Sequence, residues 1–465
     1  MRGMRSLIKS NVTKRTLSKE SSFFKMLQEG SYAVRLSALV FGFGCFRNGQ
    51  FLKGMILFLF ECVTGGFLGS QGFNHIYRLG SLGETQRKKI WNQGINMYEY
   101  IEGDNSLDIL FHGIISIAVV LFFLCLLKLS VRCAFHAEKM KREGKTPETF
   151  IDDVKMYFNQ KLHITMLSLP TIGVITCTVI PLIFIICIAF TDYSIEGNHT
   201  ILFHWVGLKN FQQVLNFSSS LSKTFYSVLL WTMVWAIVAS LSNYILGSCL
   251  AFFIHWKEIR AKKFWKACFI VTIMIPHFVS LLSIGQFLQP EGTLNVLCRN
   301  LGIIGANDSI PFFTDATWAR VTVIIINLWV GIPYTLLHVN EVLDDMPSEF
   351  ADVAKIEGVS TLQYLLKIRI PYVTVMTRPY LITALVGNIN NFNVIYLTSQ
   401  GYPMNVGETA GKTDLLITWI YKLTIHNQYF NIGATVGILT FIMLAISSIA
   451  STALYRYHVN KEGIL

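Results

Sequence analysis

The chain has 465 residues, of which 52% are hydrophobic and only 14% are charged, and its formal net charge is +11. A soluble domain carries charges at about a quarter of its positions, so this composition favours a polytopic membrane protein over a soluble enzyme. In a membrane protein an excess of Lys and Arg usually reports topology, and no basic patch interleaved with aromatic residues indicates nucleic-acid binding.

The apolar segments predict eight spanning helices, because each provides roughly the 20 mostly apolar residues that a bilayer requires. The predicted spans are 51–70, 107–132, 164–190, 225–254, 266–288, 318–340, 374–398 and 431–457. A further apolar patch at 33–45 is too short to span and contains two glycines, so we expect an interfacial or re-entrant segment there. The expected fold is an all-α polytopic membrane protein.

The distribution of Lys and Arg orients these spans. Loops 134–162 and 256–263 are rich in basic residues, whereas loops 192–222 and 290–317 are poor in them. We therefore expect the basic loops, the loop 341–373 and both termini to be cytoplasmic. Loop 71–106 must then be external although it carries Arg87, Lys88 and Lys89. A span at 33–45 would move the basic loop 134–162 outside, which fits less well.

Four regions follow from this reading. They are a basic cytoplasmic tail at 1–32, an N-terminal membrane module at 33–133 (the short segment and two spanning helices), a cytoplasmic linker at 134–162, and a six-helix core at 163–465. No convincing internal repeat occurs, which counts against a secondary transporter built from inverted repeats.

A polar stretch, PSEFADVAKIEGVSTLQYLLKIRIP at 347–371, separates two predicted spans. Its pattern predicts two short helices. Ser348 or the preceding Asp345 can cap the first helix, and Gly358 suits the left-handed residue that ends it. Ser360 and Gln363 form a capping box for the second helix, which a proline should stop before the next span. Such a helix pair on the cytoplasmic face fits either a groove on a partner protein or the lipid headgroups.

Four asparagines lie inside the predicted span 374–398, within one stretch of six residues: Asn388, Asn390, Asn391 and Asn393. Polar groups in a bilayer are costly unless they are satisfied, and they usually face the protein interior. Helical spacing places Asn388 and Asn391 on one face, and Asn390 and Asn393 on another. We expect the first pair to face a transport pathway and the second pair to bond neighbouring helices or backbone.

A second stripe lies in the preceding span, where Asn327, Val330, Gly331 and Tyr334 recur at i, i+3, i+4 and i+7. It is either a packing stripe beside a kink at Pro333 or a surface that lines a sugar pathway. Amides and a tyrosine hydroxyl hydrogen-bond sugar hydroxyls, an aromatic ring packs on a pyranose face, and a glycine makes room.

The stretch 347–371 also resembles the EAA signature of ABC importer permeases. Asp352-Val353-Ala354, Gly358 and Ile368-Arg369-Ile370-Pro371 match every spacing of that signature, with Asp for Glu, Val for Ala and Ile for Leu. The resemblance implies a cytoplasmic coupling loop at 345–371 that is seated in a cleft of a separate ATPase subunit. The positions that carry this role are Glu349, Asp352, Ala354, Gly358, Ile368 and Pro371.

Three more segments resemble the larger membrane subunit of bacterial maltose/maltodextrin importers: NLWVGIPY (327–334), GNINNFNVIYLTSQGYP (387–403) and GETAGKTDLLITWIYKLT (407–424). The short loop 192–222 is similar to that of Gram-positive members. This resemblance implies a type I permease core, and sugar contact at Gly331, Tyr334, Asn388 and Asn391. It also implies a second permease subunit, two ATP-binding cassette ATPase subunits, an extracytoplasmic sugar-binding protein and a place in the bacterial cell membrane.

The expected function is therefore that of a permease subunit for maltodextrin. Another oligosaccharide of the galacto or raffinose type is the alternative, because polar lining residues cannot identify a glycosidic linkage. An intramembrane enzyme is disfavoured because the spans are almost bare of acids, Glu61 being the main exception. No CxxC or HExxH indicates a metal site, and GETAGKT is one residue short of a phosphate-binding loop. We expect no cofactor in this chain, and ATP and Mg²⁺ in the partner ATPase.

Overall fold

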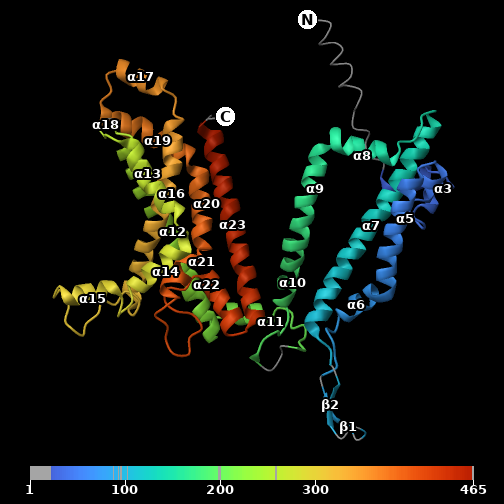
Figure 1. Ribbon diagram of the computed structural model, residues 1–465, viewed down its shortest axis with the longest axis horizontal. Coiled ribbons are helices and arrows are strands. Elements are labelled where there is room, and N and C mark those ends of the chain that lie inside the picture. Colours follow the sequence, from blue (N-terminus) through green and yellow to red (C-terminus); the bar gives the residue numbers. More distant parts are fainter. Residues whose placement is uncertain are drawn as a thin grey trace. The chain divides into compact units, whose positions relative to one another are not determined.

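The computed structural model describes residues 22–86, 88–92, 94, 97–101, 103–196, 201–256 and 259–462 (Figure 1). Most of the predicted basic tail (residues 1–21), and Arg87 of the predicted external loop, lie outside the described residues. The chain divides into two units. Unit 1 comprises residues 1–187 and 200–205, and unit 2 comprises residues 188–199 and 206–465.

Unit 1 consists of helices and one short hairpin. Its elements are α2 (Phe23–Glu29), α3 (Tyr32–Leu36), α4 (Phe43–Arg47), α5 (Phe51–Phe67), the π-helical η1 (Leu68–Gly72), α6 (Phe73–Arg78), β1 (Lys88–Asn92), β2 (Met97–Ile101), α7 (Ser106–Arg142), α8 (Phe150–Asn159), α9 (Leu162–Val174), η2 (Ile175–Val179) and α10 (Ile180–Ile188). The strands pair antiparallel, with Lys88 opposite Ile101 and Asn92 opposite Met97. In this unit the hairpin and α8 lie at opposite ends of the long helix α7 (Figure 1).

The apolar patch 33–45 folds into the short helices α3 and α4 with a turn between them. Gly42 adopts a φ of +79° in this turn, and its N–H donates to Ser130 Oγ at 2.9 Å. The Phe41 N–H donates to Glu61 Oε2 at 2.7 Å. The one prominent acid of the predicted spans therefore satisfies a backbone donor in a turn that has no helical partner for it.

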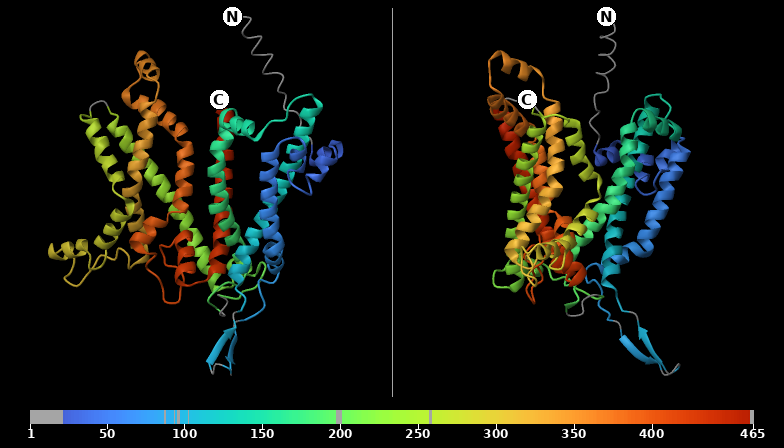
Figure 2. Two further views of the ribbon diagram at one scale, coloured as in Figure 1. Left: turned by 45° about the vertical axis from the view of Figure 1, so that its right-hand side comes forward. Right: turned by 60° about the vertical axis from the view of Figure 1, so that its left-hand side comes forward.

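Unit 2 contains the remaining helices. They are α11 (Lys209–Leu215), α12 (Ser220–Ile254), α13 (Lys262–Met274), α14 (His277–Phe287), α15 (Thr293–Asn300), α16 (Ala316–Asp344), α17 (Glu349–Ile356), α18 (Thr361–Tyr364), η4 (Leu365–Arg369), α19 (Ile370–Met376), α20 (Arg378–Ile389), α21 (Phe392–Val394), η5 (Ile395–Ser399), α22 (Leu416–Tyr421), η6 (Lys422–His426) and α23 (Phe430–Glu462). Within this unit α17 and α18 lie at one end, and α15 and α22 lie at the other (Figures 1 and 2).

The predicted all-α membrane fold is confirmed. By length and composition, six helices of the described chain could cross a membrane: Phe51–Arg78, Ser106–Arg142, Leu162–Ile188, Ser220–Ile254, Ala316–Asp344 and Phe430–Ala450. The pair α13 and α14 would make a seventh, although it bends by 85° at its break. The bend falls at Ile275–Pro276, where Pro276 precedes the first residue of α14 and cannot continue the backbone ladder of α13.

The predicted span 374–398 is not one continuous helix. It is broken into α19, α20, α21 and η5. Pro379 lies in the first turn of α20, where its missing N–H is tolerated, and a new helix begins there. After Ile389 the side-chain oxygen of Asn391 accepts from the Val394 N–H at 3.3 Å, so the amide replaces a backbone carbonyl as acceptor and caps the next helix, α21 (Phe392–Val394).

The core of unit 2 forms where α12, α14, α16 and η5 meet. Its buried side chains include Trp235, Leu281, Val323 and Ile395. Trp235 Nε1 donates to the backbone oxygen of Asn388 at 3.1 Å, so the core also holds the last turn of α20 in place. This packing fixes the positions of the polar residues described next.

Candidate functional site

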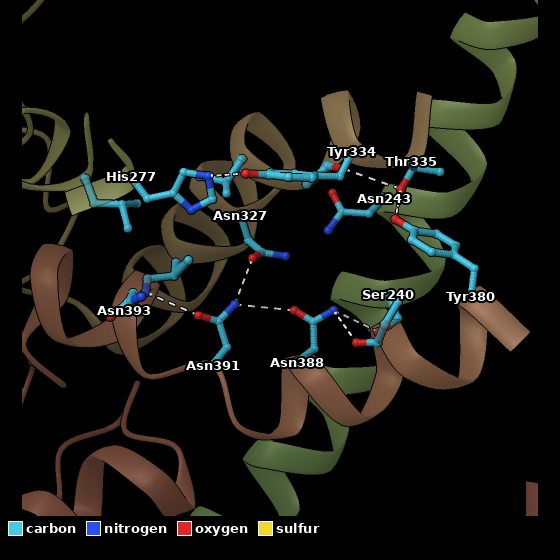
Figure 3. Close-up of a pocket in the computed structure, with 15 residues that line it drawn as sticks. Ser240, Asn243, His277, Asn327, Tyr334, Thr335, Tyr380, Asn388, Asn391 and Asn393 are labelled. Carbon is cyan, nitrogen blue, oxygen red and sulfur yellow. Dashed lines mark hydrogen bonds between the residues drawn. The ribbon is translucent and has the colours of Figure 1, made fainter. Parts of the chain in front are cut away.

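A cavity of about 240 Å³ lies within unit 2, between α12, α14, α16, α20 and the segment that follows α20 (Figure 3). All five residues predicted to contact a sugar line it: Asn327, Gly331, Tyr334, Asn388 and Asn391. The structure therefore brings together two stripes that are about 60 residues apart in the sequence.

A chain of amide hydrogen bonds runs along one wall (Figure 3). Asn391 Nδ2 donates to Asn327 Oδ1 at 3.1 Å and to Asn388 Oδ1 at 3.4 Å. Asn388 Nδ2 donates to Ser240 Oγ at 2.9 Å and to the Ala384 oxygen at 3.1 Å. These bonds fix the orientation of each amide, so the wall presents a preset pattern of donors and acceptors.

Two amide atoms in this wall have no hydrogen-bond partner. They are Nδ2 of Asn327 and Oδ1 of Asn243, and the two residues are only 3% and 7% exposed. A buried polar atom without a partner costs roughly 1–3 kcal/mol, so native proteins rarely leave one without a functional reason. Both atoms are buried beneath the cavity surface, so they can bond a ligand only after the two amides turn toward the cavity.

Gly331 contributes space to the cavity wall. A Cβ at this position would lie 2.3 Å from Asn243 Nδ2 and 2.5 Å from its Cγ. The glycine therefore admits the Asn243 amide to the wall, whereas the sequence suggested that it makes room for the ligand itself.

Two hydroxyl contacts border the amide wall. Tyr334 Oη lies 2.7 Å from His277 Nε2, and the two rings meet edge to face. Thr335 Oγ1 lies 2.8 Å from Tyr380 Oη. Ser240, Asn243, His277, Thr335 and Tyr380 were all missed from the sequence. Ser240 and Asn243 lie three residues apart on one face of a long apolar helix, and this spacing is the signal that could have found them.

The interpretation of Asn393 as a packing residue is wrong. Asn393 is exposed and lines the cavity, because the helix that set its predicted direction ends at Ile389. Asn390 is also exposed but is not part of the cavity wall.

The cavity wall carries no permanently charged side chain. No Asp, Glu, Lys or Arg lines it, and no group of three metal-ligating side chains occurs among the described residues. The wall has the chemistry to bind a hydroxyl-rich, uncharged ligand, with amides for its polar groups and tyrosine rings for its apolar faces.

The segment predicted to be a coupling loop lies at the end of unit 2 where α16 terminates (Figure 1). Gly358 ends α17 with a φ of +67°, and the Val359 N–H returns to the Ala354 oxygen at 2.9 Å. The predicted capping box is present, because the Ser360 side chain accepts from the Gln363 N–H at 3.3 Å and Gln363 Oε1 accepts from the Ser360 N–H at 3.1 Å.

One local prediction in this loop is wrong. Pro371 does not stop the second helix, which continues through η4 and α19 to Met376. Leu365–Arg369 forms a π-helical turn, in which backbone hydrogen bonds span five residues instead of four, just before the proline. Pro371 then falls in the first turn of α19. There its absent N–H leaves no bond unmade.

The surface of α17 is partly apolar. Phe350, Val353 and Ile356 are 43%, 57% and 83% exposed, while Ala354 is buried. Asp352 is exposed and pairs with Lys355 Nζ at 2.7 Å. The remaining predicted positions, Glu349, Ile368 and Pro371, lie in α17, η4 and α19.

Comparison with known proteins relates this architecture to transport systems. Residues 243–462 match the family described as "Binding-protein-dependent transport system inner membrane component". The chain is 32% identical over 443 residues to the galactooligosaccharides transport system permease protein GanP of Bacillus subtilis (strain 168), and the aligned region covers 94% of this chain and 99% of GanP. It is 30% identical over 436 residues to the maltodextrin transport system permease protein MdxF of the same organism, over 89% of this chain and 94% of MdxF.

Among solved structures, a bacterial ABC transporter involved in the import of the acidic polysaccharide alginate matches with a TM-score of 0.52 and 19% identity, over 65% of this chain and 98% of that chain. This likeness concerns the fold alone. The fold and the cavity define an inner-membrane permease component, which has a transport role and not a catalytic one. The chain belongs to the binding-protein-dependent transport system inner membrane components, within the permeases of carbohydrate ABC importers.

Proposed function

We propose that the chain forms half of the translocation pathway of an ATP-driven importer, and that the cavity receives an uncharged oligosaccharide. The observation that carries this proposal is the cavity without Asp, Glu, Lys or Arg, one wall of which is formed by the hydrogen-bonded amides of Asn327, Asn388 and Asn391. A sugar hydroxyl both donates and accepts, so it can pair with either the oxygen or the nitrogen of an amide.

The neutral wall supports an uncharged substrate. An acidic sugar would leave water without meeting a Lys or Arg side chain in this cavity, and burial of an unpaired charge is strongly unfavourable. The rings of Tyr334 and Tyr380 border the same space and can pack on a pyranose face.

The partners follow from the coupling loop and from the family. A second permease subunit completes the pathway, an extracytoplasmic binding protein delivers the sugar, and two ATPase subunits dock on the cytoplasmic side. The exposed apolar residues Phe350, Val353 and Ile356 give α17 a surface suited to a cleft in the ATPase. ATP and Mg²⁺ act in that partner. Movement of the loop changes the relative affinity of the pathway for sugar in its inward and outward states.

The topology proposed from the Lys and Arg pattern places the coupling loop and both termini in the cytoplasm. After removal of the native cysteines, a cysteine at Ser360 should react with an impermeant thiol reagent only from the inside. A cysteine at Asn405, in an exposed loop near the other end of unit 2, should react only from the outside. The opposite labelling pattern would overturn this orientation.

Two substrates have specific support. Maltodextrin follows from the sequence motifs and from the identity with MdxF. Galacto-oligosaccharides follow from the 32% identity with GanP over nearly its whole length. Amide groups hydrogen-bond sugar hydroxyls and do not distinguish the linkage between sugar units, so the proposal includes both maltodextrin and galacto-oligosaccharides.

The test is ATP-dependent uptake by the reconstituted complex in vesicles, with maltotriose and a galactotriose each supplied on the complex's own binding protein. We expect uptake of one or both, and a loss of roughly tenfold in Asn243→Ala and Asn327→Ala. Asn390→Ala, which changes an asparagine outside the cavity wall, is the matched control. If neither sugar is taken up while the ATPase subunits are active, the proposal is wrong.

A further inference from the structure

One carboxylate at the end of α16 joins three helices of unit 2. Asp344 is the last residue of α16, and its two oxygens accept from His255 Nε2 at 2.9 Å and from Lys266 Nζ at 3.0 Å. His255 directly follows α12, and Lys266 lies in the second turn of α13. The Asp344 side chain is 59% exposed, whereas those of His255 and Lys266 are 14% and 26% exposed. The carboxylate therefore covers two largely enclosed donors and ties three helix ends together.

A second polar contact joins α14 to α16 at the cavity wall. His277, the first residue of α14, meets the Tyr334 hydroxyl of α16 at 2.7 Å. Tyr334 and Asp344 are about 15 Å apart along α16, at roughly 1.5 Å per residue. The arm formed by α13 and α14 is thus held to α16 at two points, with the 85° bend between them.

Apolar packing within this chain contributes little to holding α13. None of the residues of α13 is buried, whereas α12 and α16 each bury side chains along their whole length. The angle between α13 and α16 therefore depends on the polar contacts at their ends. The bend at Pro276 gives the arm a place to pivot, because the proline interrupts the backbone hydrogen bonds there.

The first of these contacts lies at the base of the coupling loop. α17 begins at Glu349, shortly after Asp344 (Figure 1). We propose that Asp344 is a positioning residue of the transport cycle, which fixes the α13–α14 arm to the base of the coupling loop and so passes a displacement of the loop to His277 at the cavity wall. The inference rests on the proposed function. It supplies the physical connection that coupling between two distant sites requires: a pivoting element whose position both sites influence.

The test is the number of sugar molecules imported per ATP hydrolysed, measured with the complete complex in vesicles. Asp344→Asn and Lys266→Met should each lower this ratio at least fivefold. The rate of ATP hydrolysis should be unchanged or raised, and the complex should stay intact. Asp344→Glu keeps the charge and should retain at least half of the ratio. Asp345→Asn is the matched control, because Asp345 is the exposed neighbouring carboxylate and takes no part in the three-helix contact.

The outcomes separate the two proposals. If the wild-type complex shows no ATP-driven sugar uptake, the proposed function is wrong and the role of Asp344 falls with it. If the wild type transports sugar and Asp344→Asn stays within twofold of its ratio, the function stands and the inference about Asp344 is wrong. A loss in Asp345→Asn equal to that in Asp344→Asn would also contradict the inference, because it would reflect charge at the loop and not the three-helix contact.

Discussion

Replacement of Gly331 by alanine tests how the cavity wall is built. The added Cβ would lie 2.3 Å from Asn243 Nδ2 and 2.6 Å from its Oδ1. Ordinary carbon contacts are about 3.5–4.0 Å, so the amide has to move by roughly 1 Å. The group that must move is the end of a flexible side chain, so we expect the variant to fold and to reach the membrane at normal levels.

The effect on transport follows from the displaced amide. If Asn243 Oδ1 accepts a hydrogen bond from the sugar, its displacement leaves that bond unmade at a cost of roughly 1–3 kcal/mol. At about 1.4 kcal/mol per tenfold change, sugar uptake at low concentration should fall by roughly 5-fold to 150-fold. Uptake in vesicles is measured beside Gly387→Ala as control, because a Cβ at Gly387 meets no atom within 4 Å.

A double variant shows whether Asn243 carries the effect. Asn243→Ala alone should lower uptake to a similar extent, and Gly331→Ala combined with Asn243→Ala should be no worse than Asn243→Ala, because contacting residues are non-additive. Uptake by Gly331→Ala within twofold of wild type, or strictly additive losses in the double variant, would refute this account of the wall.

Three further outcomes are expected. Gly358→Val should reduce co-purification of the ATPase subunits, whereas Gly358→Asn should be tolerated, because nothing crowds a Cβ there and only the φ of +67° excludes a β-branched residue. Asn388→Leu should lower sugar uptake by roughly tenfold through loss of the amide chain, whereas Asn390→Leu, outside the wall, should leave it unchanged. Asp414→Asn should lower the thermal unfolding temperature of the detergent-solubilised complex, because it breaks a buried ion pair with Lys422 (2.6 Å) at a cost of about 3–5 kcal/mol; an unchanged unfolding temperature would show that this contact is dispensable.

Local features of the coupling loop could be predicted from the sequence. The left-handed turn at Gly358 and the capping box of Ser360 with Gln363 each depend on residues within one helical turn, and both are present. The stripe that contains Asn327 and Tyr334 could be predicted for the same reason, because helical periodicity alone places its members on one face.

Features that depend on helix breaks could not be predicted as well. The direction of Asn393 was derived from a continuous helix, and the helix ends at Ile389. Likewise Pro371 was expected to end a helix, but a π-helical turn before it lets the helix continue. In both cases the choice between competing backbone hydrogen bonds was made by the surrounding structure and not by the local residue pattern.

The sequence by itself determined the membrane class, the local turns of the segment 347–371 and two of the polar stripes, because hydropathy, capping residues and helical periodicity all act over short stretches of chain. Only the tertiary structure decided that Ser240, Asn243, His277 and Tyr380 complete the cavity wall. These residues come from α12, α14 and α20, which are separate segments of the chain. Their common position arises from how the helices pack, and packing depends on contacts between residues that are far apart in the sequence.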